Sequence, residues 1–436
     1  MKVKSVALRR SKWSSERAFV LATAAAAVGL GNVWRFPYIA GENGGAAFVF
    51  AYLIAVLIIG LPLMMLEITA GRIKQGGVVR TFRSINKRAA WFGWLVAGLT
   101  LFILSYYLVI TGWTLGFAVN SLTGNLHSFE EFTNGYLPLM YFAIVLGISA
   151  FVSLKGVKLI EATSRYLMPV LFLVILFLAG YGLTLPGSSE ALSFLFSPDF
   201  SSFSNPVLWT LAFGQAFYSL AIGQGYLMTY GSYLPKHINL PRATASVAGI
   251  ETVIALIAGL MIFPIVFTFG LNPAEGTELA FTTLPLAFGS LAFGSILAIV
   301  FFWLFFLAAI SSCIASMQVI KTTMREELNI SNLRAVVIAV LLLLPFGVLS
   351  ALSFTPMEVE LFGKPFLQFM DMITANQIVI LSGLIGGAII SWSVPKHSVT
   401  RLFSRKYKHF AWHVIIATRY LWLIVLLILI ASLIVE

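Results

Sequence analysis

Residues 29–38 read GLGNVWRFPY, and this stretch lies inside an otherwise apolar segment long enough to cross a membrane. Glycine and proline loosen or end helices, so the segment is predicted to be a transmembrane helix with a break in it. In hydrocarbon an unpaired backbone N–H or C=O is costly, and a helix is interrupted only where its open backbone lines a cavity or holds a ligand. We therefore expect a binding site here, at mid-membrane.

The composition is that of an integral membrane protein. Hydrophobic residues make up 59% of the chain and charged residues 10%, and the mean hydropathy is +0.94. A soluble domain of 436 residues could not bury so much apolar surface. One crossing takes about 20 mostly apolar residues, and the sequence predicts eleven transmembrane helices. They are expected at residues 16–40, 45–71, 89–122, 135–154, 163–185, 206–234, 240–271, 291–327, 333–354, 365–394 and 410–435.

The net charge of +11 is explained by membrane topology rather than by nucleic-acid binding. When successive loops are assigned to alternate sides, most of the 28 Lys and Arg residues fall on one side. By the positive-inside rule that side is cytoplasmic. The N-terminal segment 1–12 is then cytoplasmic and the C-terminus lies outside, in a multi-pass protein of the inner (plasma) membrane. Segment 1–12 is basic and polar and leads directly into the first span, so no cleavable signal peptide is expected.

A second predicted break gives the chain an internal symmetry. Residues 221–225 read AIGQG and lie in the sixth apolar segment, five segments after the first break. Because five is odd, a second five-helix unit enters the membrane in the opposite orientation. We expect inverted repeats over residues 13–185 and 206–394, followed by a cytoplasmic loop and an eleventh helix over 395–436. Substrate and ions bind where such half-helices meet, because their ends present unpaired N–H and C=O groups.

Several separated motifs resemble the neurotransmitter:sodium symporter family, and specifically its bacterial amino-acid transporters. The resemblance extends from residue 13 to about residue 395. Its motifs are the runs 34–37, 42–45 and 60–62, then Glu67, Gly71, Arg72 and Tyr107, the run 113–117, Gly214, Gln215, Phe217, the run 229–233, Ser311, Ser312, Met317 and Gln318. The resemblance implies an all-α, leucine-transporter-like fold with helices 1 and 6 unwound. It also implies sodium-coupled import of an amino acid by alternating access.

The same resemblance implies two sodium sites. The second site of the family would use backbone carbonyls and hydroxyls, which are hard oxygen ligands suited to an alkali cation. Its residues here are Ala25, Val28, Ala308, Ser311 and Ser312. The first site would combine the Ala27 carbonyl, the side chains of Asn32 and Ser219, and the substrate carboxylate. Because ion and substrate would share a ligand, their binding would be reciprocal.

The seventh helix places Glu251 at the position that completes the first sodium site in the family. An intramembrane carboxylate is costly and marks a functional site. Glu251 could ligate sodium, replace the bound chloride that animal relatives need, or carry a proton during the cycle. It could also lie near the inner end of its helix and reach water. Chloride is not expected to be required.

The substrate pocket implied by the resemblance is lined by twelve residues. They are Ala26, Ala27, Leu30, Gly31, Ile103, Tyr107, Tyr218, Ser219, Ala221, Gln224, Ser312 and Ser316. The Tyr107 hydroxyl and the N–H groups of Leu30 and Gly31 would bind the substrate carboxylate. Gly29 stands where amine-carrying relatives have Asp, so the substrate is expected to be an α-amino acid. Small residues leave room for an apolar or aromatic side chain, from leucine-like to tryptophan-like, although Gln224 adds a polar group.

The resemblance also supplies two gates. Arg35 and Asp371 would meet across the outer vestibule, while Arg10, Trp13, Tyr233 and Glu326 would close the inner one. Asp371 has an alternative interpretation as a surface carboxylate at a helix start.

Three other functions are kept as alternatives. The chain could be a non-transporting amino-acid sensor of the same fold, or a transporter of another small zwitterion. A membrane enzyme is poorly supported, because His409 and His413 are four residues apart but have no HExxH motif around them.

Overall fold

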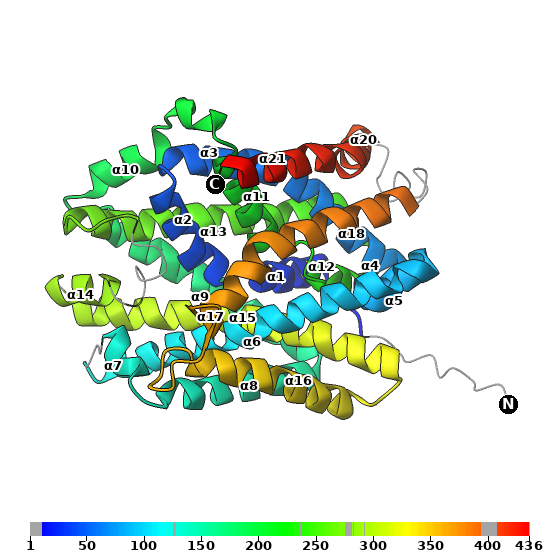
Figure 1. The fold of residues 1–436 in the computed structure, drawn as a ribbon, viewed down its shortest axis with the longest axis horizontal. Helices are drawn as coiled ribbons and strands as arrows, with labels where there is room; N and C mark the ends of the chain where they lie inside the picture. Colours follow the sequence, from blue (N-terminus) through cyan, green and yellow to red (C-terminus); the bar gives the residue numbers. More distant parts are fainter. Residues whose placement is uncertain are drawn as a thin grey trace.

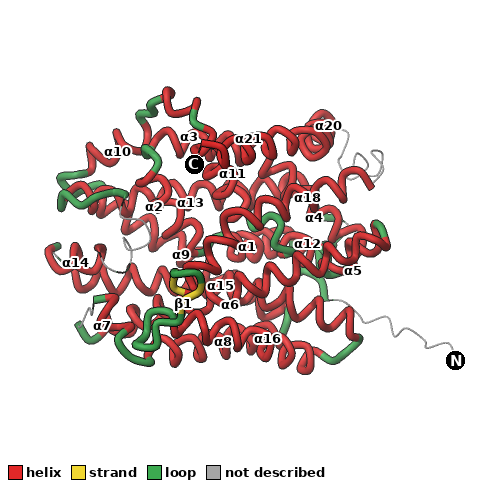
Figure 2. The backbone as a smooth tube through the Cα atoms, in the orientation of Figure 1, coloured by secondary structure: helices red, strands yellow, loops and turns green. Residues whose placement is uncertain are grey.

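Long helices lying roughly side by side make up nearly all of the described chain (Figure 1, Figure 2). The computed structural model describes residues 11–124, 128–235, 237–274, 281, 283–291, 293–393 and 408–435. In the first half the α-helices are α1 (Glu16–Ala27), α2 (Phe36–Glu42), α3 (Ala46–Ala55), α4 (Leu61–Lys74), α5 (Val78–Ile85), α6 (Ala90–Leu122), α7 (Phe129–Thr133), α8 (Leu137–Lys155), α9 (Val157–Gly182) and α10 (Ser188–Phe196). Short π or 3-10 segments are η1 (Gly31–Arg35), η2 (Val56–Gly60), η3 (Lys87–Ala89) and η4 (Phe200–Ser204).

The second half continues in the same way. Its α-helices are α11 (Pro206–Ser219), α12 (Tyr226–Gly231), α13 (Leu240–Thr268), α14 (Thr283–Ser290), α15 (Gly294–Leu328), α16 (Asn332–Leu352), α17 (Phe366–Asp371), α18 (Val379–Ser393), α20 (Lys408–Ile416) and α21 (Trp422–Val435). Two π segments, η6 (Met372–Ile378) and η8 (Ala417–Leu421), join neighbouring helices. A short antiparallel hairpin of β1 (Glu360–Leu361) and β2 (Lys364–Pro365) pairs Glu360 with Pro365.

Each predicted span has a helix, or a pair of consecutive helices, as its counterpart among the described residues. Nine helical spans are long and apolar enough to cross a membrane, and the bent pair Glu16–Ala27 with Gly31–Glu42 is a tenth, among the described residues. The remaining predicted segment, 206–234, is divided between α11 and α12. The first and sixth segments are thus the interrupted ones, as the sequence predicts.

The fifth span starts earlier than its hydropathy predicts. α9 begins at Val157 instead of residue 163, and Glu161, its fifth residue, accepts a hydrogen bond from the chain before α1. Hydropathy places the start later, because Lys158 and Glu161 interrupt the apolar run in these first residues.

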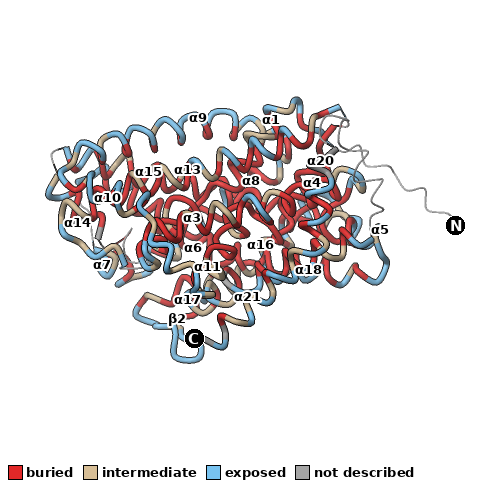
Figure 3. The backbone as a smooth tube through the Cα atoms, turned by 90° about the horizontal axis from the view of Figure 1, so that it is seen from above, coloured by how far each residue is buried: buried red, intermediate tan, exposed pale blue. Residues whose placement is uncertain are grey.

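The centre of the molecule is formed by α6 and α15, which pack along each other. The stretch 103–118 of α6 and the stretch 308–324 of α15 are buried on every face. A helix that is apolar and buried all round belongs to the core of a bundle. By contrast, α9 runs along the rim in the view from above and is exposed on its outer face (Figure 3). Leu173 and Phe177 on α9 are among the exposed apolar residues that suit a lipid environment.

The two ends of the bundle carry different loops. Figure 1 places α5 and α20 at one end and α7, α10 and α14 at the other. This grouping agrees with the alternate assignment of loops to two sides made from the sequence. Which end faces the cytoplasm stays a prediction based on charge.

The last transmembrane helix is attached to its neighbour by Arg419. The guanidinium donates to the Ser391 carbonyl near the end of α18, with Nε at 2.9 Å and Nη2 at 2.6 Å, and lies 5.5 Å from the Trp392 ring centroid. The Ser391 hydroxyl in turn donates to the Thr418 carbonyl at 3.1 Å. These contacts fix the depth of the last helix against α18.

Arg419→Met is expected to lower the melting temperature of the detergent-solubilised protein. It keeps the side-chain length but removes charged hydrogen bonds, a loss of about 2 kcal/mol. Arg334→Met is the control, because Arg334 is exposed. Equal melting temperatures for the two variants would show that Arg419 does not hold the helix.

Candidate functional site

The first break opens the backbone between α1 and η1. α1 ends at Ala27, Val28 is extended (φ −74°, ψ 101°), and the axis bends by 54° before the helix resumes at Gly31. The second break covers residues 220–225, between α11 and α12. Ala221, Gly223 and Gly225 have φ values of 56°, 76° and 77°, which no helix can contain. Both predicted interruptions are therefore real and expose main-chain groups inside the bundle.

Three other helices hold the second break in place. Glu67 of α4 accepts a hydrogen bond from the Gly223 N–H at 2.9 Å, and Ser382 of α18 donates to the Gly223 carbonyl at 2.6 Å. Thr100 of α6 donates to the Gln224 carbonyl at 2.6 Å. Glu67 is 1% exposed. Side chains thus replace the helical hydrogen bonds that the break gives up, as a buried backbone requires.

Glu67→Leu is expected to reduce transport by about tenfold or more and to lower the melting temperature. It leaves the buried Gly223 N–H without an acceptor, which costs about 1–3 kcal/mol. Glu67→Gln is the matched variant, because its amide oxygen can still accept that hydrogen bond, and it should stay near wild type. If both variants were impaired equally, the negative charge rather than the hydrogen bond would be the important property.

The two breaks meet at a small central cavity. It is lined by Ala26, Ala27, Gly29, Gly31, Ile103, Tyr107, Tyr218, Ala221, Gln224, Tyr226 and Ser312. Its volume is about 20 Å³, enough for one water molecule. An amino acid needs more space, so the surrounding side chains must move apart to admit one.

Nine of the twelve predicted substrate residues line this cavity, and three lie just behind it. Leu30 lines an adjoining cavity toward the outer end, and Ser219 lies beside Tyr52. The Ser316 hydroxyl lies 2.5 Å from the Tyr226 hydroxyl. Tyr226 and Gly29 line the cavity but were not included in the predicted pocket. The position of Tyr226, directly after the second break, was a signal that could have identified it.

Tyr107 and Gly29 shape one wall of the cavity. The Leu30 N–H donates to the Tyr107 hydroxyl at 2.8 Å, and the Tyr107 hydroxyl also hydrogen-bonds the Ser312 side chain. A Cβ atom on Gly29 would lie 2.5 Å from both the Tyr107 hydroxyl and the Ser312 Oγ. Position 29 therefore has no room for a side chain.

The predicted first sodium site is organised around Glu251. Its Oε1 accepts from Asn32 Nδ2 at 2.5 Å, and the Tyr52 hydroxyl lies 3.1 Å from each carboxylate oxygen. Hydroxyls of Thr252 and Ser219 also hydrogen-bond the carboxylate. Glu251 is 0% exposed, so the interpretation that it reaches water at the inner end of its helix is wrong. Because Asn32 uses its amide nitrogen here, its amide oxygen can serve as an ion ligand.

The residues of the predicted second sodium site lie together between α1 and α15. The Ser311 hydroxyl donates to the Ala25 carbonyl at 2.6 Å and to the Ala308 carbonyl at 2.7 Å. The Ser312 hydroxyl donates to the Ala26 carbonyl at 3.1 Å. Val28 is the last residue before the break, and its extended conformation turns its carbonyl away from the helix ladder. The Ser311 hydroxyl thus lies beside main-chain oxygens of two helices, while the sodium site itself stays a prediction.

The predicted outer gate lies between the central cavity and a larger vestibule. Arg35 and Asp371 line the same adjoining cavity, together with Tyr38 and Tyr106. Arg35 donates to Gln215 Oε1 at 2.6 Å, and its guanidinium lies 5.1 Å from the Tyr218 ring centroid. Asp371 is the last residue of α17 and accepts a hydrogen bond from Tyr106. It is the sixth residue of the helical span Phe366–Ser393, near the start of that span.

The vestibule beyond this layer has a volume of about 610 Å³. It is lined mainly by aromatic and aliphatic residues, with Asp371 on its surface. Asp371 lines both this vestibule and the adjoining cavity that contains Arg35, Tyr107 and Tyr218.

The inner end is closed by Trp13 and the chain around it. Trp13 is 2% exposed, and its indole N–H donates to the Tyr230 carbonyl at 2.9 Å. The Tyr233 hydroxyl lies 3.0 Å from Thr322 Oγ1 and accepts from Gln318 at 3.0 Å. Glu326 accepts from the Gly77 N–H at 2.8 Å. Arg10, the fourth predicted member of this gate, lies outside the described residues.

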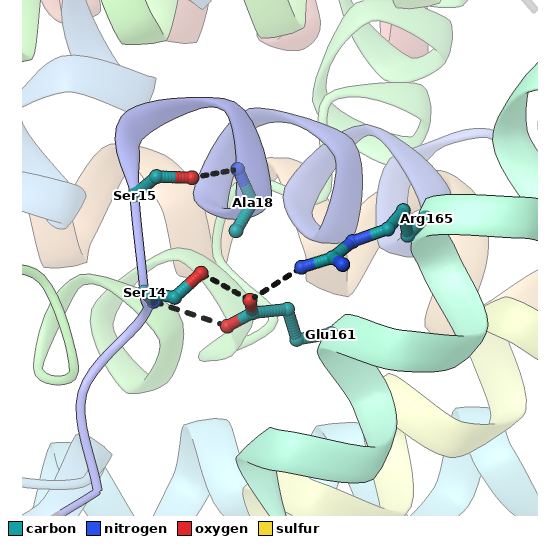
Figure 4. A network of polar contacts seen from close by, with 5 residues as sticks. All are labelled: Ser14, Ser15, Ala18, Glu161 and Arg165. Carbon is teal, nitrogen blue, oxygen red and sulfur yellow. Dashed lines mark hydrogen bonds and ion pairs between the residues drawn. The ribbon is translucent and has the colours of Figure 1, made fainter.

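A polar contact keeps the Trp13 segment against α9 (Figure 4). The backbone N–H of Ser14 donates to Glu161 at 3.1 Å, and the Ser14 hydroxyl donates to the other carboxylate oxygen. Arg165 pairs with the same carboxylate at 3.3 Å, and Ser15 caps α1 by accepting from the Ala18 N–H. Glu161, near the start of α9, therefore holds the segment that contains Trp13.

Known proteins resemble this chain over most of its length. The model of the sodium:neurotransmitter symporter family matches residues 10–138 and 127–436. The chain is 35% identical over 406 residues to an uncharacterized sodium-dependent transporter, YhdH, of Bacillus subtilis (strain 168), covering 88% of each chain. It is 32% identical over 427 residues to an uncharacterized sodium-dependent transporter of Haemophilus influenzae, covering 92% of this chain and 93% of the relative.

One solved structure resembles this chain over nearly its whole length. It is the crystal structure of MhsT in complex with L-phenylalanine, with a TM-score of 0.90 and 36% sequence identity. The match covers 97% of this chain and 100% of MhsT in that structure. The fold expected from the sequence, all-α and leucine-transporter-like with the first and sixth helices unwound, is thus confirmed.

Proposed function

Because this chain belongs to the sodium:neurotransmitter symporter family, we propose that it imports an α-amino acid with an apolar or aromatic side chain, driven by sodium. The observation that carries this proposal is the central cavity, where both helix breaks, Tyr107 and Ser312 converge. Main-chain groups released by the breaks offer both N–H donors and C=O acceptors to a zwitterion.

The shape of the cavity supports a substrate that keeps its carboxylate. Gly29 leaves no space for the carboxylate side chain that would bind an amine. The Tyr107 hydroxyl, which accepts from the Leu30 N–H and hydrogen-bonds the Ser312 side chain, would exchange the Ser312 contact for a substrate carboxylate beside the first sodium site. Ile103, Ala221 and Ala26 form apolar walls, while Gln224 and Tyr226 add polar groups. The L-phenylalanine bound to MhsT supports an aromatic side chain in the same place.

Two closures support alternating access. Arg35, Tyr218 and their neighbours lie between the central cavity and the vestibule, and Trp13 packs against Tyr233 at the other end. Opening one closure while the other stays shut would carry substrate and ions across the membrane. The proposed orientation has the basic end in the cytoplasm and the protein in the inner (plasma) membrane.

Two sodium ions would make the coupling strong. Each inward Na⁺ gains about 2.3 kcal/mol from a potential of about 100 mV and about 1.4 kcal/mol from a tenfold gradient. Two ions give roughly 7 kcal/mol, enough for a substrate gradient of about 10⁵. One ion would support a substrate gradient of only about a few hundredfold.

Uptake of a labelled amino-acid panel into proteoliposomes tests the proposal. An inward sodium gradient is compared with potassium or choline, with and without chloride. Sodium-dependent, chloride-independent accumulation of one apolar or aromatic amino acid is expected. Binding without accumulation would favour a sensor, and accumulation of a different small zwitterion would correct the substrate class. No effect of sodium would refute the ion sites.

Ser311→Ala is expected to raise the sodium concentration for half-maximal uptake by about tenfold or more. It removes one oxygen that contacts both the Ala25 and Ala308 carbonyls. Ser149→Ala on α8 is the control, since Ser149 is an equally buried hydroxyl away from the cavity. An unchanged sodium dependence in Ser311→Ala would place the second ion elsewhere.

A further inference from the structure

The segment 72–88, between the second and third spans, has an unusual charge. It contains six basic residues, Arg72, Lys74, Arg80, Arg83, Lys87 and Arg88, and no acidic residue. The positive-inside rule accounts for the sign of this charge but not for how the side chains are arranged in space. Their arrangement distinguishes two groups.

Three of the six side chains are used inside the protein. Arg72 donates to the Ile238 carbonyl at 3.0 Å, and Lys74 donates to the Ser84 carbonyl at 3.0 Å. Arg83 forms an ion pair with Glu327 at the end of α15. These contacts fold the segment into α5 and fasten it to the bundle.

The other three are exposed. Arg80, Lys87 and Arg88 are solvent-accessible and have no ion-pair partner within the described part of the chain. Arg80 and Lys87 line a groove of about 510 Å³ between α5 and the end of α15. The groove, called here the basic groove, is lined by Arg80, Arg83, Ser84, Lys87, Glu326 and Glu327.

The acidic residues of the basic groove are already occupied. Glu327 pairs with Arg83, and Glu326 accepts from the Gly77 N–H at 2.8 Å. Glu326 and Glu327 are half-buried, whereas the cations Arg80 and Lys87 along the groove are exposed. Such a cavity attracts a phosphate group.

Exposed apolar residues follow these cations in the chain, at the start of α6. Trp91, Trp94 and Leu95 at the start of α6 are 61%, 39% and 56% exposed. Trp91 is in edge contact with Phe92, which itself contacts Phe82 of α5, so this band is fixed beside the groove. Tryptophan collects at the level of lipid headgroups, where one side is apolar and the other wet. The cations next to it are therefore at the depth of lipid phosphates.

We propose that the basic groove binds the phosphate headgroup of an anionic membrane lipid. The cations match the charge of such a headgroup, and the adjoining apolar band matches its acyl chains. A free phosphate ion would make no use of Trp91, Trp94 and Leu95. The site is distinct from the central cavity and does not depend on which amino acid is carried. Because Glu326 lines the groove and is also a predicted inner-gate residue, the lipid would contact the element that closes the inner end.

Native mass spectrometry of the full-length protein in a neutral detergent tests this. The protein is titrated with phosphatidylglycerol and, separately, with phosphatidylcholine. Arg80→Gln/Lys87→Gln/Arg88→Gln is expected to weaken phosphatidylglycerol binding by about a hundredfold. The matched control is Lys155→Gln/Lys158→Gln/Arg334→Gln, which removes three exposed cations at the same end of the bundle. It should change phosphatidylglycerol binding by less than about threefold.

Three outcomes would overturn the proposal. Equal losses in both triple variants would mean that general charge, not the groove, attracts the lipid. Displacement of phosphatidylglycerol by millimolar glycerol phosphate would identify a soluble anion as the ligand. Binding of phosphatidylcholine as tight as that of phosphatidylglycerol would show that the groove does not recognise the negative charge of the lipid. If the groove variant Arg80→Gln/Lys87→Gln/Arg88→Gln does not fold, Lys87→Gln alone should still weaken phosphatidylglycerol binding by about fivefold.

Discussion

Glu251→Ser is expected to take up amino acid at about one hundredth of the wild-type rate in chloride-free buffer and to recover when chloride is added. In the wild type, Asn32, Tyr52 and other donors all point at the Glu251 carboxylate. Removing one partner from a buried charged network costs about 3–5 kcal/mol. Serine leaves these donors in place and opens space beside them, so a chloride ion can take the position of the carboxylate. Uptake measured against chloride concentration in proteoliposomes checks this.

A second variant separates the three roles left open for Glu251. Glu251→Gln fills the same space but places an amide N–H₂ against the Asn32 amide or the Tyr52 hydroxyl. If the carboxylate replaces chloride, Glu251→Gln should be impaired and chloride should not rescue it. Uptake that persists in Glu251→Gln but loses its dependence on pH would indicate a proton carrier. A raised sodium requirement in both variants, with no effect of chloride, would indicate direct ligation of sodium.

Gly29→Ala is expected to weaken amino-acid binding by a hundredfold or more. The added Cβ would lie 2.5 Å from both the Tyr107 hydroxyl and the Ser312 Oγ, which is well inside van der Waals contact. Tyr107 is 6% exposed and is held by the Leu30 N–H, so it cannot move without losing that hydrogen bond. Binding is measured by equilibrium dialysis with the labelled substrate found in the uptake panel.

The control for this variant is Gly98→Ala on α6. A Cβ at Gly98 meets no atom within 4 Å, so the same substitution should leave binding near wild type. If Gly29→Ala also bound normally, the substrate would not occupy the wall between Tyr107 and Ser312. The pocket proposed for the carboxylate would then be wrong.

Part of the candidate site was accessible from the sequence because it is carried by main-chain features. Gly29, Gly223 and Gly225 mark the two breaks, and a break in an apolar segment is visible as glycine in a run of hydrophobic residues. The residues that hold the breaks were not accessible in the same way. Glu67 and Thr100 contact Gly223 and Gln224 from helices more than a hundred positions earlier in the chain. Nothing in the local pattern around either residue indicates its partner.

The sequence by itself determined the membrane class, the eleven spans and the two interrupted helices, because hydropathy, length and glycine placement are properties of short stretches of chain. Only the tertiary structure decided that Tyr52 meets Glu251, that Tyr226 lines the cavity and that α9 begins at Val157. Such contacts depend on the rotation and depth of each helix against its neighbours. Packing between helices sets both, and the composition of a single helix sets neither.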